Sequence, residues 1–245
     1  MFRSKFLSVL RELEVDEWLE WLKNLPPSII DFTGGEPTLY HDFAELINGL
    51  VLYGHKWAIT SNTLIIPEVS SNGCLSWTAS YHPLTQIPRY HTTFTENILH
   101  LRDSGFYVSV SIVAYPSYLH RLEDMIAKFR AMEFPVGILP YYTTGFSWYE
   151  TSYADEIQKF IPYMTENKNL TWQENSEPKL CSAGKDYVTV QPDGQVWRCY
   201  SGFIQLAKSH YMGNIKGRIN PVEERCSIPC LFPCDWLRCS HVPVG

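Results

Sequence analysis

The sequence lacks clustered basic residues and long apolar runs. It has 20 lysine and arginine residues against 26 aspartate and glutamate residues, which gives a net charge of -6. Because nucleic-acid binding relies on clustered positive charge, we expect no nucleic-acid partner. No apolar stretch reaches the roughly 18 residues of a membrane span, and the first fifteen residues contain arginines and glutamates where a secretory signal is apolar. We therefore expect no membrane insertion and a cytoplasmic location.

Cysteine is absent from the first 73 residues. Cys74 begins an apolar segment, and we interpret it as a buried structural cysteine. Cellular thiol pools keep cytoplasmic cysteines reduced, so a cluster of cysteines in such a chain indicates metal binding more than disulfide formation. The remaining six cysteines are the candidate metal ligands: Cys181, Cys199, Cys226, Cys230, Cys234 and Cys239.

Apolar strands alternate with amphipathic helices over the first 140 residues. The predicted strands are 28–33, 56–60, 75–80, 106–114 and 135–140, and the predicted helices are 15–25, 41–54, 94–104 and 118–132. This alternation predicts an α/β fold with a parallel sheet and right-handed crossovers, in the form of an open or partly closed barrel. Its functional residues are expected at the carboxyl ends of the strands.

The pattern changes after Pro140 to an aromatic loop, 141–153, and then to turn-rich sequence that carries the cysteines. We place a domain boundary near residue 170. The chain is thus expected to have a partial barrel in residues 1–170 and a small cysteine-rich domain in residues 171–245.

The segment Gly34-Gly35-Glu36-Pro37 directly follows the predicted strand 28–33. Two glycines let the backbone approach a ligand closely, and the carboxylate of Glu36 can accept hydrogen bonds from an ammonium group. A strand-to-helix turn with a solvated glutamate would have the same sequence. The motif by itself leaves both interpretations open.

This motif at a strand end resembles the radical S-adenosylmethionine (radical SAM) enzymes, in which the glycines and the glutamate hold the methionine amino group of S-adenosylmethionine. The resemblance extends to Thr60-Ser61-Asn62 at the next strand end. It implies that Gly34, Gly35, Glu36, Pro37, Ser61 and Asn62 bind this cofactor. His82 lies at the end of strand 75–80. A capping or core histidine with local hydrogen bonds explains this position at least as well as a histidine that contacts a substrate.

Two cysteine patterns occupy the tail. Cys181 and Cys199 form C-x12-G-x4-C, with Gly194 in a turn between two short strand-like runs, and a hairpin of this kind brings its flanking thiols together. The other four cysteines follow as C-x3-C-x3-C-x4-C in residues 226–239. Thiolates repeated at this spacing can converge on one metal centre.

The tail resembles the SPASM and Twitch domains of radical SAM enzymes, which open with C-x9–15-G-x4-C, often continue to Gly-Asn-Ile and bind auxiliary [4Fe-4S] clusters. Gly213-Asn214-Ile215 matches the second feature, but the later spacing departs from the usual C-x2-C-x5-C-x3-C. Six thiolates are too few for two clusters ligated only by cysteine, so one auxiliary cluster is expected. A zinc site remains open as an alternative because four thiolates also hold Zn²⁺.

A radical SAM enzyme also carries C-x3-C-x2-C after its first strand, and this motif has no counterpart in the 245 residues. An N-terminally truncated product and a natural loss of the reaction both explain the difference, and we favour truncation. The chain as given is then expected not to cleave S-adenosylmethionine. The strand at 28–33 is expected to lie at an open edge of the barrel.

The resemblance implies a radical SAM oxidoreductase or modifying enzyme that acts on a peptide or a small molecule. It would receive electrons from a donor such as a flavodoxin or ferredoxin. The alternative is a non-catalytic scaffold or binding protein with a structural zinc or iron–sulfur site. A weaker option is a peptide-binding module that uses the aromatic loop 141–153.

Overall fold

The computed structural model describes residues 11–85, 87, 89–140, 159–160, 183–199, 203 and 208–220. These residues fall into two compact units. One lies within Leu22–Asn169, and the other joins residues of Met1–Trp21 to residues of Leu170–Gly245. Helix α1, Val15–Lys23, begins in the second of these units and ends in the first.

The unit within Leu22–Asn169 contains a five-stranded sheet with the order β1-β2-β3-β4-β5, in which every neighbouring pair is parallel. Its strands are β1 (Ile29–Phe32), β2 (Lys56–Ser61), β3 (Cys74–Tyr81), β4 (Val108–Ala114) and β5 (Val136–Pro140). Its helices are η1 (Pro37–Leu39), α2 (Phe43–Leu52), α3 (Tyr90–Asp103), η2 (Pro116–Arg121) and α4 (Leu122–Ala131). The parallel α/β sheet predicted from the sequence is confirmed.

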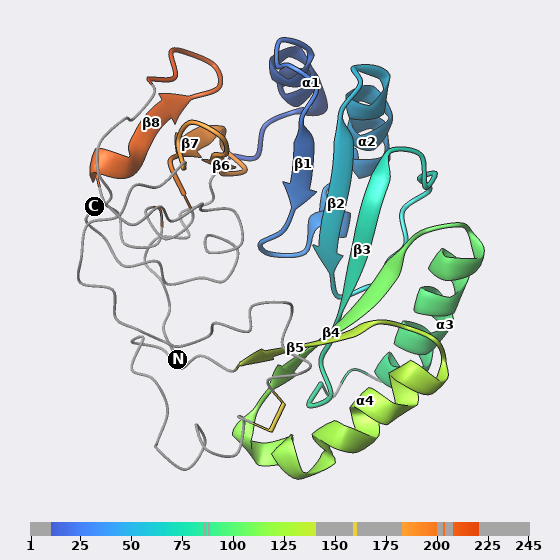
Figure 1. Ribbon diagram of the computed structural model, residues 1–245. Coiled ribbons are helices and arrows are strands. Elements are labelled where there is room, and N and C mark those ends of the chain that lie inside the picture. Colours follow the sequence, from blue (N-terminus) through green and yellow to red (C-terminus); the bar gives the residue numbers. More distant parts are fainter. Residues whose placement is uncertain are drawn as a thin grey trace. The chain divides into compact units, whose positions relative to one another are not determined.

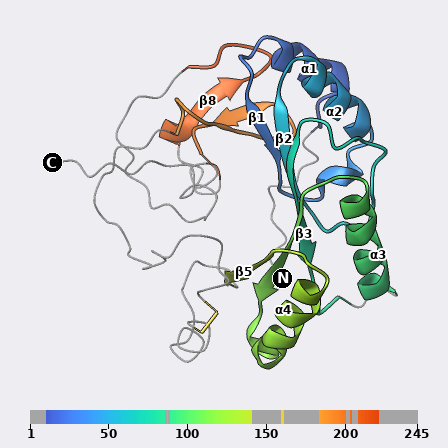
Figure 2. The same ribbon diagram turned by 45° about the vertical axis from the view of Figure 1, so that its right-hand side comes forward.

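The helices α2, α3 and α4 cover one face of this sheet (Figures 1 and 2). The ring of Phe43 on α2 packs against Trp57 on β2. Tyr81 on β3 contacts Phe94 of α3 and Phe129 of α4. Sequential parallel strands joined by crossovers of one hand place all connecting helices on the same face, as in a barrel. None of the helices described is long and apolar enough to cross a membrane.

All three helices end in the same way and return the chain to the next strand. In α2, the N–H of Gly54 donates to the carbonyl of Val51, and the N–H of His55 donates to the carbonyl of Leu50. This pair of bonds is a Schellman motif, which needs a residue with positive φ, and Gly54 has a φ of +85°. Equivalent pairs of hydrogen bonds end α3 at Gly105 and α4 at Glu133, and both residues have positive φ.

His55 links the starts of β1 and β2. Its side chain is buried, and Nδ1 accepts a hydrogen bond from the N–H of Ser28 at 3.1 Å. Because Nδ1 is an acceptor, Nε2 carries the proton and donates to the carbonyl of Leu22 at 2.9 Å. The imidazole therefore fixes the end of α1 and the start of β1 next to β2.

Strand β1 lies at an edge of the described sheet. Its ladder runs only to β2, from Ile29 opposite Lys56 to Phe32 opposite Ile59. The expectation that the strand at 28–33 lies at an edge is confirmed for the part of the chain that the structure describes.

The other unit contains a three-stranded antiparallel sheet: β6 (Thr189–Val190), β7 (Gln195–Trp197) and β8 (Tyr211–Asn214), in that order. The predicted hairpin around Gly194 is present, and Gly194 has a φ of +81° in its turn. The N–H of Leu13 donates to the carbonyl of Pro192 at 2.9 Å. The segment before α1 therefore packs on this hairpin, which the sequence pattern did not indicate.

Candidate cofactor-binding site

The loop after β1 is open on the side of its two glycines. Gly34 has a φ of +113°, a conformation that other residues rarely adopt. Both Gly34 and Gly35 are exposed, and a Cβ at either position would meet no protein atom within 4 Å. Glu36 then caps η1, and Pro37 occupies the first helical turn, where its missing N–H costs no hydrogen bond.

The carboxylate of Glu36 connects this loop to the end of β2. Its Oε1 accepts hydrogen bonds from the N–H and the Oγ1 of Thr38, at 3.2 and 2.8 Å, and from the Oγ of Ser61 at 2.8 Å. Its Oε2 accepts a hydrogen bond from the N–H of Asn62 at 2.7 Å. The structure thus brings the predicted residues Glu36, Ser61 and Asn62 together at the carboxyl edge of the sheet.

The network leaves specific positions for a ligand. A carboxylate offers about four acceptor positions. Three of the four bonds that Glu36 accepts go to Oε1, so Oε2 keeps room for another donor. The Oδ1 of Asn62 accepts from the N–H of Leu64, whereas its Nδ2 has no hydrogen bond within the described residues. One acceptor and one donor are therefore available for a ligand with both kinds of group.

Ser61 plays a supporting part, because its side chain is only 2% exposed. Its Oγ donates to Glu36 and accepts from the N–H of Thr63 at 2.9 Å. The Oγ1 of Thr63 accepts from the indole of Trp77 at 3.2 Å, and the carbonyl of Thr63 accepts from Nδ2 of Asn97 at 2.7 Å. Sequence reasoning missed these supporting residues. Only the polar Asn97 inside an amphipathic helix gave a signal.

His82 follows β3 at the same edge. Its N–H donates to the hydroxyl of Tyr90 at 2.7 Å, and that hydroxyl donates to the carbonyl of Ser80 at 3.3 Å. Burial lowers the pKa of His82, and the negative charge of Glu36 opposes this shift. Burial also raises the pKa of Tyr90 to about 12, so its hydroxyl keeps its proton. The backbone of His82 is thus satisfied locally, and its imidazole is neutral at pH 7.

The sheet face opposite α2, α3 and α4 is polar near this edge. Thr60, Thr78 and Ser109 lie side by side in the register of β2, β3 and β4. The hydroxyls of Thr78 and Ser109 are 3.4 Å apart. Ser80 pairs with Ser111 in the next row towards the edge. Hydroxyl groups therefore line the strands up to the level of His82.

Cys74 lies at the opposite end of β3 from Tyr81 and the candidate site. Its side chain is half-buried, and burial raises the pKa of its thiol to about 11. The thiol is therefore protonated at neutral pH, which agrees with a structural role and makes it a poor metal ligand.

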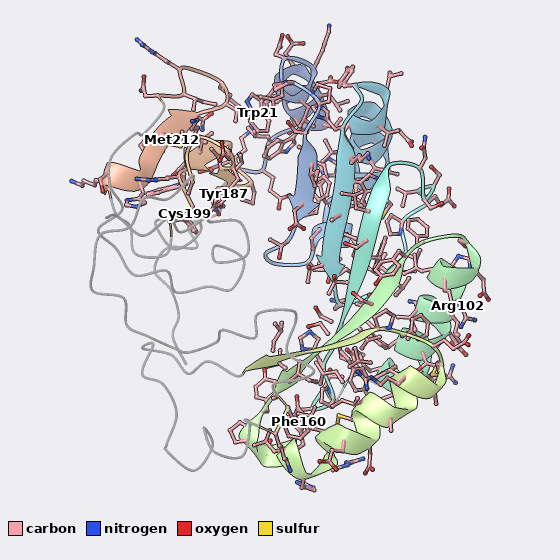
Figure 3. The ribbon with its side chains drawn as sticks, in the orientation of Figure 1. Trp21, Arg102, Phe160, Tyr187, Cys199 and Met212 are labelled. Carbon is pink, nitrogen blue, oxygen red and sulfur yellow. The ribbon has the colours of Figure 1, made fainter. Side chains whose placement is uncertain are left out.

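Cys199 lies two residues after the end of β7 and is buried, and it packs with Ala183 and Tyr187 (Figure 3). Among the described residues, no group of three or more histidine, cysteine or acidic side chains could hold a metal ion. The other predicted ligands, Cys181, Cys226, Cys230, Cys234 and Cys239, lie outside the described residues. The metal site in the tail therefore stays a prediction.

The chain resembles two solved proteins in fold. It aligns with native anSMEcpe with bound AdoMet at a TM-score of 0.60 and 13% identity, over 84% of this chain and 69% of that chain. It aligns with Streptococcus suis SuiB bound to S-adenosylmethionine at a TM-score of 0.58 and 13% identity, over 84% of this chain. The fold is a partial (β/α) barrel of the radical SAM type.

At these identities, the likeness is one of fold. The chain spans 57% of the length of SuiB, so it corresponds to little more than half of that protein. No protein-family model and no curated protein matches the chain. The partial barrel places Glu36 and Asn62 at the carboxyl edge of its strands, where ligands bind in folds of this class.

Replacing Glu36 by Gln should lower the pKa of His82 further. The negative charge of Glu36 raises this pKa against the effect of burial, so its removal leaves burial less opposed. The measurement is an NMR titration of the His82 ring protons. Glu45→Gln on the exposed side of α2 removes the same charge away from the site and serves as the control. An unchanged or higher pKa of His82 in the Glu36 variant would contradict this electrostatic coupling.

Proposed function

We propose that this chain binds S-adenosylmethionine at the carboxyl edge of its sheet, as part of a radical SAM enzyme that modifies a peptide. The observation that carries the proposal is the carboxylate of Glu36, which is held in place by four hydrogen bonds and keeps an acceptor position on Oε2. The fold supports it, since anSMEcpe and SuiB were solved with this cofactor bound.

The residues present fit the amino-acid end of the cofactor. Its ammonium group requires an acceptor, which Oε2 of Glu36 supplies, and its carboxylate requires a donor, which Nδ2 of Asn62 supplies. Gly34 and Gly35 leave space for close approach of the ligand to the backbone. Ser61 acts indirectly, because its buried hydroxyl holds Glu36 in position.

When bound together with an iron–sulfur cluster, the cofactor supplies the radical that removes hydrogen from a substrate. Among the described residues of the unit that carries this edge, the cysteine is Cys74, and it starts β3 at the other end. The role that we assign to the described residues is therefore to bind and orient the cofactor. Electrons would come from a donor such as a flavodoxin or ferredoxin.

A peptide is the substrate class that we favour over a small molecule. Native anSMEcpe was solved with AdoMet and a Kp18Cys peptide, and SuiB was solved with its precursor peptide SuiA. In this chain, the hydroxyls of Thr78, Ser80, Ser109 and Ser111 lie on the sheet face that the helices leave uncovered. Such groups both donate and accept hydrogen bonds, as the amide groups of a peptide require.

We further propose that Cys181 and Cys199 hold an auxiliary [4Fe-4S] cluster with ligands from Cys226, Cys230, Cys234 and Cys239. Cys199 is buried, and its neighbour Arg198 donates from Nε to the carbonyl of Ala183 at 2.7 Å. This bond ties the chain that follows Cys181 to the segment after β7 that contains Cys199. The arrangement supports a site shared by the two ends of the hairpin.

Replacing Gly35 by Ala should weaken the binding of S-adenosylmethionine at least tenfold. The added Cβ meets no protein atom within 4 Å, and Gly35 has no positive φ, so the protein itself has room for it. A ligand bound against the backbone of Gly35 leaves no room for this Cβ. Isothermal titration calorimetry of the purified chain measures the effect, and a thermal melt checks that the variant is folded.

Gly217→Ala is the matched control, because that Cβ also has room, with its nearest atom at 3.9 Å, and lies in the other unit. Its affinity should equal that of the wild-type chain. If the wild-type chain does not bind S-adenosylmethionine, the proposed function is wrong. If Gly35→Ala binds as tightly as wild type, the cofactor does not approach this loop.

The chain purified without oxygen should contain iron and acid-labile sulfide bound through the tail. Replacing Cys181 and Cys199 together by Ala should remove most of the absorbance in the visible range, because two ligands of the cluster are lost. Elemental analysis and visible spectra provide the measurement, and Cys74→Ala is the control. A colourless protein with stoichiometric zinc would instead support the structural-metal alternative.

A further inference from the structure

Thr63 has a backbone conformation that its residue type rarely adopts. It lies two residues after the end of β2, is fully buried and has a φ of +60°. A positive φ is an outlier for a β-branched residue, because the side chain then crowds the backbone. The other described non-glycine residues with positive φ, Arg89 and Glu133, are not β-branched. A strained residue persists only where its surroundings hold it, and such residues cluster at functional sites.

Four hydrogen bonds from three elements hold Thr63 in this conformation. Its N–H donates to Oγ of Ser61 on β2 at 2.9 Å, and its Oγ1 donates to the carbonyl of Ser61 at 3.2 Å. Trp77 on β3 donates to the same Oγ1. Asn97 on α3 donates to the carbonyl. The surroundings therefore fix both the side chain and the backbone of this residue.

Asn97 holds the loop after β2 from the helix α3. Its Nδ2 donates to the carbonyl of Thr63 at 2.7 Å and to the carbonyl of Leu64 at 3.3 Å. A side-chain amide nitrogen carries two N–H groups, so both bonds can form together. Phe94 and Leu101 lie three residues before and four residues after Asn97 on the same helix face, and both are buried. The packing of this face keeps the amide in place.

The conformation of Thr63 determines how Asn62 is presented at the candidate site. The Oδ1 of Asn62 accepts from the N–H of Leu64 at 2.9 Å, which closes an Asx turn around Thr63. Such a turn copies a β-turn, and several β-turn types require a positive φ at a central position. The bond to Oδ1 fixes the side-chain amide whose Nδ2 we assign to the cofactor. The backbone N–H of Asn62 donates to Oε2 of Glu36 at 2.7 Å.

We propose that Asn97 is a positioning residue for the candidate cofactor-binding site. By holding the carbonyls of Thr63 and Leu64, its amide keeps Thr63 in the left-handed conformation and so fixes Asn62 before a ligand binds. A preformed site binds more tightly, because less conformational freedom is lost on binding. This inference rests on the proposed function. It adds a residue of α3 to those that determine the affinity for S-adenosylmethionine.

The experiment replaces Asn97 by Ala in the full chain. Alanine is compatible with the helix and removes both hydrogen bonds to the loop. In the ligand-free chain, the backbone N–H of Asn62 should exchange with solvent faster, as measured by NMR. In isothermal titration calorimetry, the affinity for S-adenosylmethionine should fall about tenfold, which is the size expected from the loss of one ordinary hydrogen bond.

Thr95→Ala is the matched control on the same helix. Its hydroxyl donates to the carbonyl of His91 at 2.8 Å, within α3, so its loss affects the helix and not the loop. This variant should keep the wild-type exchange rate at Asn62 and the wild-type affinity. Thermal melts check that both variants are folded.

A second comparison tests whether Asn97 acts through the conformation of Thr63. Glycine adopts a positive φ without strain, so a Thr63→Gly chain has less need of the amide. Asn97→Ala should therefore lower the affinity by a smaller factor in the Thr63→Gly chain than in the wild-type chain. A general loss of helix stability would lower it by the same factor in both, and equal factors would contradict the inference.

The outcomes separate this inference from the proposed function. If the wild-type chain binds S-adenosylmethionine and Asn97→Ala binds it as tightly, Asn97 does not position the site and the proposed function stands. Unchanged exchange at Asn62 in that variant would overturn the inference as well. If the wild-type chain does not bind S-adenosylmethionine, the proposed function is wrong and the positioning role is wrong with it.

Discussion

The site depends on one carboxylate that connects two strand ends. Parallel strands are hydrogen-bonded along their length, but the loops that leave their carboxyl ends are not held by the sheet. Glu36 supplies this connection by accepting from Thr38 in its own loop and from Ser61 and Asn62 after β2. Hydrogen bonds to a charged group contribute about 1.5–3 kcal/mol each, so the loop is fixed before any ligand binds. The same charge acts on the imidazole of His82 after β3.

Much of this arrangement could be predicted from the sequence. The alternation of apolar strands and amphipathic helices predicts the parallel sheet. Because ligands bind at the carboxyl ends of such strands, it also predicts that Glu36, Ser61 and Asn62 lie at one edge. The different roles of these three residues, ligand contact for Glu36 and Asn62 and support for Ser61, could not be predicted. Ser61 shares the helix-covered face with the buried Trp57 and Ile59, so its hydroxyl supports Glu36 from inside the fold. The support of Thr63 by Trp77 and Asn97 depends on packing between distant segments, and the polar Asn97 inside an amphipathic helix is its only local signal.

In the smaller unit, too, the sequence predicts local structure but not contacts between distant segments. Its hairpin was predictable because the turn at Gly194 requires a positive φ and short apolar runs flank it. The hydrogen bond from the N–H of Leu13 to the carbonyl of Pro192 could not be predicted. It joins backbone groups that lie far apart in the sequence and that almost any residue can supply. That the indole Nε1 of Trp197 has no hydrogen-bond partner among the described residues is likewise a property of its neighbours in the folded chain. Contacts of this kind arise only in the folded chain, so sequence motifs do not indicate them.

A crystal structure of the chain with S-adenosylmethionine tests the central claim most directly. The account predicts that the ammonium nitrogen of the cofactor lies about 2.7–3.1 Å from Oε2 of Glu36, within hydrogen-bond distance. It also predicts that the bonds from Thr38, Ser61 and Asn62 to the carboxylate persist in the complex. A cofactor bound elsewhere, or a Glu36 side chain that leaves Ser61 and Asn62 to reach it, would contradict the account.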